Sequence, residues 1–242
     1  MGMILYYVPE GPPSLAVMMA LKHFGIDYKL VEVNFPKGEH LKEEYEKINP
    51  QKKIPTLDDN GFILGESTAI MQYLAEEYKK GDPIYPNEPK KRAIVNHRLA
   101  FNMASYYPSI GAYAVMYHHC TNYHDRILIR YSLTIKDSSW VKKVNYVLSS
   151  FDKILEKQNS KFSAGDNLTI ADFALVAATL SLEAIDFSFS DYKHVTKWYN
   201  TFKQECPELW SVAEEGMNVL RNFNINIPRF PHLDHPLNPV RK

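Results

Sequence analysis

A proline-rich segment at residues 81–89 divides the chain into two parts with different patterns of apolar residues. Before it, short apolar runs typical of strands alternate with stretches in which apolar residues recur every three or four positions, as in helices. After it, the recurring pattern is helical. Three prolines and one glycine within the segment favour a linker. The 242 residues therefore predict an α/β domain at 1–80, a linker at 81–89 and an all-α domain at 90–223.

The first domain has the signals of a small mixed sheet. Met3–Val8 is a short apolar run and Tyr28–Val33 alternates apolar with charged residues, so both segments favour strands. A helical stretch between them begins at Ser14, and this crossover makes the two strands parallel. Asn60-Gly61 between two further apolar runs indicates an antiparallel hairpin. We therefore expect a mixed sheet with helices on its faces.

The second domain is predicted to be built from helices alone. Their spacing places them at residues 90–117, 138–158, 171–187, 194–204 and 207–222. Thr169 and Asp172 stand three positions apart, in a pattern typical of a capping box. The tail at 224–242 holds four prolines, so it cannot be regular helix and is expected to be extended coil.

Composition excludes several classes of partner. Lys and Arg together number 28, as do Asp and Glu, so we expect no nucleic-acid partner and no electrostatic attachment to a membrane. No apolar run reaches the roughly 18 residues that span a bilayer. The first residues lack the basic segment of a secretory signal. Two cysteines make no disulfide framework and fit a reducing compartment. These features predict a cytoplasmic protein.

Four segments follow predicted strands and are candidates for a binding site. Ligands of open α/β sheets bind outside the carboxyl ends of the strands, so these segments should converge. They are Tyr7–Ser14, the loop around His40, Asn49–Pro55 and Gly65–Ser67.

Two of these segments favour a specific chemistry. If the Ile54–Pro55 peptide bond is cis, the Ile54 backbone projects outward and can pair with an extended peptide. The alternative is an ordinary trans proline that opens a strand. Ser67 stands at a predicted helix N-terminus, where free backbone N–H groups favour an anion. The alternative is a plain N-cap.

Five motifs stand in a fixed order along the chain. They are Gly38-Glu39-His40-Leu41-Lys42, Ile48-Asn49-Pro50-Gln51-Lys52-Lys53-Ile54-Pro55-Thr56-Leu57, Asp59-Asn60-Gly61-Phe62, Glu66-Ser67-Thr68-Ala69-Ile70 and Leu168-Thr169-Ile170-Ala171-Asp172. Together they closely resemble the cytosolic glutathione S-transferases, in particular the insect delta and epsilon classes or an unclassified relative of these. The resemblance covers nearly the whole chain. It implies a thioredoxin-like mixed-sheet domain followed by an all-helical domain.

The resemblance also implies partners. Glutathione is the expected co-substrate, and small apolar electrophiles are the expected second substrates. A homodimer is expected, in which the hairpin and the helix at 66–78 of one subunit meet the helix at 90–117 of the other.

The way in which glutathione is held also follows from the resemblance. Glutathione is an extended tripeptide with two carboxylates and one ammonium. Ile54 is expected to pair with its cysteinyl backbone, next to a cis Pro55. Glu66 and Ser67 are expected to hold its γ-glutamyl end, and His40 and Lys52 its glycyl carboxylate. The full set of expected glutathione-binding residues is Gly11, Pro13, His40, Lys52, Lys53, Ile54, Pro55, Glu66, Ser67 and Thr68.

The chain departs from the family's pattern where the sulfur is activated. Gly11 stands at the position of the family's catalytic serine, and Lys52 and Thr68 replace a histidine and an arginine. A free thiol has a pKa near 8.5, so another group must stabilise the thiolate. Tyr7 and Ser14 are the two candidate catalytic hydroxyls, with backbone amides or water as further alternatives. Each residue also has a structural interpretation, Tyr7 as a core aromatic and Ser14 as an N-cap.

An electrophile pocket is expected along the helix at 90–117. By resemblance, Tyr107 and Ile110 face the substrate. The candidate pocket residues are Tyr107, Ile110, Tyr113, Ala114 and Phe223. Most of them share one helix face, and a stripe with this spacing is also typical of a helix packed into a core.

No metal is expected as a cofactor. His118, His119, Cys120 and His124 lie close together in sequence, but their spacing fits no standard zinc pattern.

The first hypothesis is therefore an enzyme that conjugates the glutathione thiolate to apolar electrophiles, a reaction of the detoxification type. The alternative is a non-catalytic protein of the same fold that binds glutathione or apolar ligands, suggested by the glycine at position 11.

Overall fold

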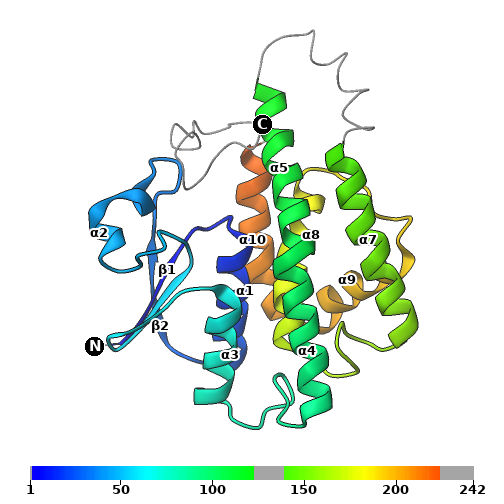
Figure 1. Ribbon diagram of the computed structural model, residues 1–242, viewed down its shortest axis with the longest axis horizontal. Coiled ribbons are helices and arrows are strands. Elements are labelled where there is room, and N and C mark those ends of the chain that lie inside the picture. The colour runs from blue at the N-terminus through cyan, green and yellow to red at the C-terminus, as the bar shows by residue number, and fades with distance from the viewer. Residues whose placement is uncertain (1, 123–138, 224–242) are drawn as a thin grey trace.

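The computed structural model describes residues 2–122 and 139–223, with the side chains of residues 115–122 outside the description. Figure 1 shows a small sheet domain beside a bundle of long helices. A mixed-sheet domain followed by a helical domain confirms the predicted fold class. The predicted tail at 224–242 lies outside the described residues.

Four strands form one mixed sheet in the order β2-β1-β3-β4. β1 (Met3–Tyr7) pairs in parallel with β2 (Tyr28–Glu32) and antiparallel with β3 (Thr56–Asp59). β4 (Phe62–Leu64) pairs antiparallel with β3, so the predicted hairpin is confirmed. The two turn residues, Asn60-Gly61, have φ angles of 53° and 98°, and positive φ at both positions is what a tight type I′ hairpin requires.

The helices of the first domain flank this sheet. They are α1 (Pro12–Phe24), the 3₁₀ turn η1 (Glu39–Leu41), α2 (Glu43–Glu46) and α3 (Ser67–Tyr78). α1 begins two residues before the predicted start at Ser14. Its first two residues are Pro12 and Pro13, and proline suits the first turn of a helix because the missing N–H has no partner there.

The second domain consists of helices in its described part. They are α4 (Pro89–Phe101), the π-helical turn η2 (Asn102–Tyr106), α5 (Tyr107–Asn122), α7 (Ser139–Gln158), α8 (Ile170–Ala184), α9 (Lys193–Glu205) and α10 (Pro207–Phe223). The helix predicted at 90–117 is thus present, but η2 interrupts it. None of the helices that the structure describes is long and apolar enough to cross a bilayer.

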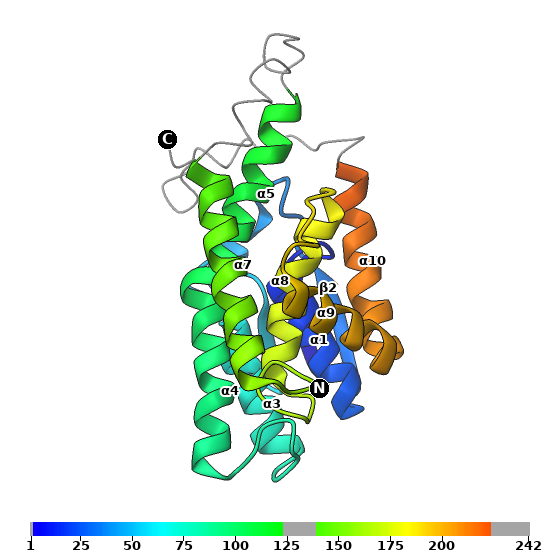
Figure 2. The same ribbon diagram turned by 90° about the vertical axis from the view of Figure 1, so that its right-hand side faces the viewer.

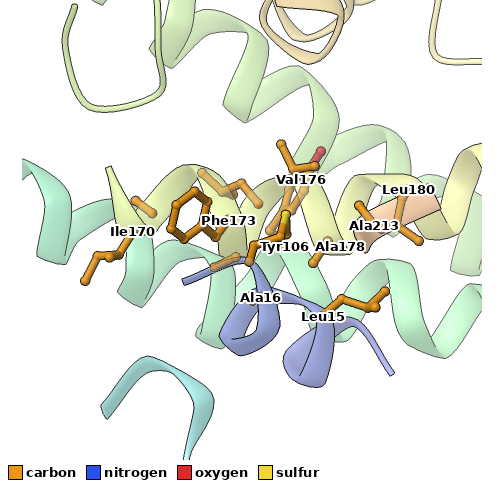
Figure 3. Packing of buried hydrophobic residues seen from close by; sticks show 14 of the residues in the cluster. Leu15, Ala16, Tyr106, Ile170, Phe173, Val176, Ala178, Leu180 and Ala213 are labelled. Carbon is orange, nitrogen blue, oxygen red and sulfur yellow. The ribbon is translucent and has the colours of Figure 1, made fainter. Parts of the chain in front are cut away.

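α8 is the centre of the helical domain and also its contact with the sheet domain. All but one of its side chains are buried, and it packs against α1, α5 and α10. Figures 1 and 2 both show it inside the bundle. Figure 3 shows Leu15 and Ala16 of α1 facing α8 near Ala178, with Tyr106 beside them. The two domains therefore share one hydrophobic core.

Asp172, near the start of α8, is fully buried and its carboxylate accepts four hydrogen bonds. Oδ2 accepts from the Thr169 N–H and from Thr169 Oγ1, both at 2.9 Å. Oδ1 accepts from the Ser163 N–H at 2.8 Å and from Trp198 Nε1 at 2.9 Å. The bond from the Thr169 N–H to the Asp172 carboxylate confirms the predicted capping-box contact between the N3 side chain and the N-cap backbone. The same carboxylate also joins α8 to α9.

We expect the Asp172→Ala variant to be strongly destabilised, because four buried donors lose their acceptor at once. Each unsatisfied buried donor costs about 1–3 kcal/mol, so the free energy of unfolding should fall by about 3 kcal/mol or more. Denaturant unfolding measures this change. Asp191→Ala, at an exposed position before α9, serves as the control and should change the free energy by less than about 0.5 kcal/mol. Equal stability of the two variants would contradict the prediction.

Candidate functional site

A cavity of about 340 Å³ opens between the two domains. Pockets for small ligands have volumes of roughly 300–1,000 Å³, so the cavity is large enough for one. It is lined by Pro12, Pro13, Ala16, Lys53, Ile54, Pro55, Glu66, Ser67 and Thr68 of the first domain and by Asn102, Met103, Tyr107 and Ala174 of the second.

The turn between β1 and α1 supplies part of the lining. The Gly11 N–H donates to the Val8 carbonyl at 3.1 Å, and the Val8 N–H donates to Ser14 Oγ at 3.2 Å. Ser14 is 1% exposed. These bonds fix the turn so that Pro12 and Pro13 reach the cavity.

α10 packs against the outer side of the β1–α1 turn. It packs on α1 at Gly216, where an added Cβ would lie 2.5 Å from Leu15 Cδ1 and 2.7 Å from the Pro9 carbonyl oxygen. Real Cβ atoms do not come this close to other heavy atoms, so a glycine is required for the approach.

The loop before β3 supplies a second part of the lining. The Lys53 carbonyl accepts hydrogen bonds from Tyr45 Oη at 2.9 Å, Asn49 Nδ2 at 3.0 Å and Thr56 Oγ1 at 3.1 Å. These bonds fix the backbone next to the Ile54–Pro55 peptide bond, which is cis, as the peptide-pairing hypothesis requires.

The start of α3 supplies a third part. Glu66 precedes the helix with a φ of 60°, a conformation that non-glycine residues adopt at a cost and that is common at ligand sites. Ser67 and Thr68 form the first turn of α3 and line the cavity. Backbone N–H groups at a helix N-terminus bind anions, so this end of the cavity suits a carboxylate.

The helical domain contributes polar and aromatic groups. Asn102 is 9% exposed, and its Oδ1 has no hydrogen-bond partner in the part of the chain that the structure describes. An unsatisfied buried carbonyl is costly, so a ligand that donates a hydrogen bond would be favoured next to it. Burial raises the pKa of Tyr107 to about 12, so its hydroxyl stays protonated at neutral pH. Met103 is half exposed at the same wall.

The cavity brings together many of the residues that the sequence predicts for the site. They are Pro13, Lys53, Ile54, Pro55, Glu66, Ser67, Thr68 and Tyr107. The sequence reasoning missed Pro12, Ala16, Asn102, Met103 and Ala174. For Asn102 a signal was available, since it is a polar residue within an otherwise apolar helical stretch.

Neither of the two predicted catalytic hydroxyls is among the residues that line this cavity. Burial raises the pKa of Tyr7, and the carboxylates of Glu32, Glu10 and Glu215 raise it further. Ser14 is buried under the β1–α1 turn and bonded to the backbone there. Their catalytic roles stay predictions.

Two residues expected at the glycyl end also lie outside the lining. Lys52 Nζ lies 2.8 Å from Glu46 Oε2 and donates to the Leu41 carbonyl at 3.2 Å. His40 is 2% exposed and stacks on Phe35, with the ring centroids 4.7 Å apart. Lys53 is the lysine whose side chain belongs to the cavity wall.

Most of the expected electrophile-pocket residues pack into the core. Ile110, Tyr113 and Ala114 are 0%, 7% and 8% exposed. Phe223 is the last residue of α10 and is not among the lining residues. Of the expected set, Tyr107 lines the cavity, and the contribution of the others to a pocket stays a prediction.

The candidate metal ligands cannot be placed. The side chains of His118, His119 and Cys120, together with His124, lie outside the described part of the structure. Among the described side chains, no group of three or more His, Cys, Asp or Glu residues is positioned to hold a metal ion.

Comparison with known proteins identifies the family. Residues 1–76 match the model of the glutathione S-transferase N-terminal domain, and residues 136–205 match that of the C-terminal domain. The chain therefore belongs to the glutathione S-transferase family, and it is a glutathione transferase.

Solved structures of insect members are similar over nearly the whole chain. A diazinon-metabolizing glutathione S-transferase of the silkworm Bombyx mori is 43% identical, with a TM-score of 0.80, and the match covers 91% of this chain and 100% of that one. A delta-class glutathione transferase of Nilaparvata lugens is 38% identical, with a TM-score of 0.77 and coverage of 93% and 99%. Glutathione transferase E6 of Drosophila melanogaster is 26% identical, with a TM-score of 0.73 and coverage of 94% and 98%. These likenesses confirm the resemblance found in the sequence.

We expect the Gly216→Ala variant to lose both stability and affinity for glutathione. The added methyl group forces α10 away from Leu15 and Pro9, and overpacking of this kind costs about 1–3 kcal/mol. The free energy of unfolding and calorimetric binding of glutathione measure the two effects. Glu214→Ala, an exposed position on the same helix, is the control. If Gly216→Ala behaves like this control in both measurements, the contact does not hold the turn.

Proposed function

We propose that the protein conjugates the thiolate of glutathione to small apolar electrophiles, as an enzyme of the detoxification type. The observation that carries this proposal is the cavity itself. Segments of the first domain around Ile54 and Ser67 and a wall of the second that holds Met103 and Tyr107 line the same space. One wall can therefore hold the tripeptide while the other receives the electrophile.

The proposed position of glutathione follows from the charges and donors of the lining. Its γ-glutamyl carboxylate lies at the N-terminus of α3, where Ser67 and Thr68 offer backbone N–H groups and hydroxyls. Its cysteinyl backbone pairs with Ile54. Its glycyl carboxylate points toward Lys53, which lines the cavity.

The electrophile occupies the side of the cavity formed by Met103, Tyr107 and Pro12. A polarizable thioether and an aromatic ring suit flat apolar compounds. The silkworm relative that metabolizes diazinon supports small apolar xenobiotics as the substrate class.

A homodimer is part of the proposal. Five large apolar side chains are 40–52% exposed on β4, α3, α4 and η2, and they are Phe62, Ile63, Tyr78, Ile94 and Met103. Large exposed apolar patches mark interaction surfaces. A second copy of the chain that covers these residues agrees with the pairing implied by the resemblance. A cytoplasmic location is proposed on the same resemblance.

Turnover of chlorodinitrobenzene with glutathione tests the catalytic proposal. We expect a rate above the uncatalysed reaction, and Ser67→Ala should raise the KM for glutathione about tenfold, because it removes a hydrogen bond to a charged group. Thr201→Ala is the control, since Thr201 is a half-buried hydroxyl on α9 that is not among the residues lining the cavity.

The outcomes of this test separate the candidate functions. Binding of glutathione without turnover of any of several electrophiles would support the non-catalytic alternative. Absence of glutathione binding at millimolar concentration would contradict both.

The dimer is tested with the Phe62→Glu variant, which places a charge among these exposed apolar side chains. Sedimentation equilibrium should find a dimer for the unchanged protein and a monomer for this variant. Tyr146→Glu is the control, since Tyr146 is 73% exposed on α7, outside this set, and this variant should stay dimeric. A monomeric unchanged protein, or a dimeric Phe62→Glu variant, would contradict the proposed surface.

A further inference from the structure

The group that stabilises the thiolate is the open question at this site. Position 11 is a glycine, so it has no hydroxyl to offer. The first turn of α1 is also poor in donors. Pro12 and Pro13 have no N–H, and the N–H groups of Gly11 and Leu15 already donate to Val8 and Gly11. The Ser14 N–H and hydroxyl remain in this turn, but Ser14 is 1% exposed and does not line the cavity, which favours a donor from the residues that do.

Three residues that line the cavity carry hydroxyls, namely Ser67, Thr68 and Tyr107. Ser67 and Thr68 stand at the N-terminus of α3, which the γ-glutamyl carboxylate occupies in the proposed complex. Tyr107 enters from the helical domain and shares the cavity with Pro12 and Pro13, which directly follow Gly11.

We propose that Tyr107 is a catalytic residue whose hydroxyl donates a hydrogen bond to the sulfur of bound glutathione, in place of the serine that this chain lacks. The inference rests on the proposed function and deepens it, since it assigns the group that activates the thiol.

The backbone around Tyr107 explains how its hydroxyl comes to be available. Tyr106 and Tyr107 are adjacent, at the junction between the π-helical turn and α5. The Tyr106 hydroxyl is buried and lies 2.9 Å from Thr179 Oγ1 in the core. Among the side chains and backbone groups that the structure describes, which leave out the side chains of residues 115–122, the Tyr107 hydroxyl has no hydrogen-bond partner. The Tyr106 hydroxyl is therefore bonded within the core, whereas the Tyr107 hydroxyl is available to a ligand in the cavity.

The Tyr107 ring lies over Gly111, one turn further along α5. A Cβ added at this glycine would lie 3.4 Å from the Tyr107 ring atom Cε2, in ordinary van der Waals contact. Burial keeps the hydroxyl protonated, so it acts as a donor to the thiolate. The charged side chains that line the cavity are Lys53 and Glu66.

The glutathione S–H ionises and its proton passes to water. Tyr107 keeps its own proton and donates a hydrogen bond to the sulfur anion. The thiolate attacks the electrophilic carbon, a sulfur–carbon bond forms, and the leaving group departs with the bonding electron pair.

The environments of Tyr7 and Ser14 favour a thiolate less. Glu10, Glu32 and Glu215 surround Tyr7, and their negative charge would oppose a sulfur anion there. Ser14 is 1% exposed under the β1–α1 turn, where its Oγ accepts the Val8 N–H, and it is not among the residues that line the cavity.

The Tyr107→Phe variant tests the proposal. The absorbance of the thiolate gives the pKa of bound glutathione, and the pH dependence of kcat/KM gives it independently. The free energy of a hydrogen bond to a charged group is equivalent to a pKa shift of about one to two units. The pKa of the bound thiol should therefore rise by this amount in the variant. At neutral pH, kcat/KM should fall about tenfold. The difference in kcat/KM between the variant and the unchanged protein should become smaller at high pH, where the glutathione bound to either one is ionised.

Tyr106→Phe is the matched control, because it removes the neighbouring hydroxyl from the core. It should lower the melting temperature and leave the thiol pKa unchanged. An unchanged thiol pKa in Tyr107→Phe, or a loss of rate that is equal at every pH, would contradict the proposal. A shift in Tyr7→Phe or Ser14→Ala with none in Tyr107→Phe would contradict it as well. Failure of the unchanged protein to bind glutathione would instead contradict the proposed function.

Discussion

The packing of α1 against α8 is the contact on which the rest of the structure depends. Leu15 and Ala16 of α1 are almost fully buried against a helix that is itself buried nearly throughout (Figure 3). Each large apolar side chain buried in such a contact contributes about 1.5–3 kcal/mol. The same two helices also line the cavity, through Ala16 and Ala174. The contact that joins the domains therefore also sets the distance between the walls of the site.

The chemistry of the site depends on how the cavity accommodates negative charge. Glutathione brings two carboxylates, and the reaction adds a thiolate. The start of α3 offers the positive end of a helix dipole and free N–H groups. The start of α1 offers fewer free N–H groups, because two prolines occupy its first turn. In the proposed mechanism, the Tyr107 hydroxyl of the helical domain supplies the donor for the sulfur that glycine at position 11 cannot.

Local signals in the sequence predicted much of the fold. Asn60-Gly61 specified the hairpin because both turn residues must adopt positive φ, and few other residue pairs do so at low cost. The apolar spacing located the helices to within a few residues. The π-helical turn at Asn102–Tyr106 was not predictable in this way, since a single inserted residue leaves the overall spacing almost helical. That turn is where Asn102 and Met103, two of the missed site residues, enter the cavity.

The sequence by itself determined the fold class and the family, because both follow from residue patterns and short motifs in a fixed order. It also showed that the usual serine is absent at Gly11. Only the tertiary structure decided which hydroxyls reach the cavity. From the sequence, Tyr7 and Ser14 are the candidate donors, and Tyr107 is a candidate only for the electrophile pocket. Whether each one lines the site depends on the neighbouring carboxylates, the closure of the β1–α1 turn and the docking of α1 on α8. These are contacts between segments far apart in the chain, and no local pattern encodes them.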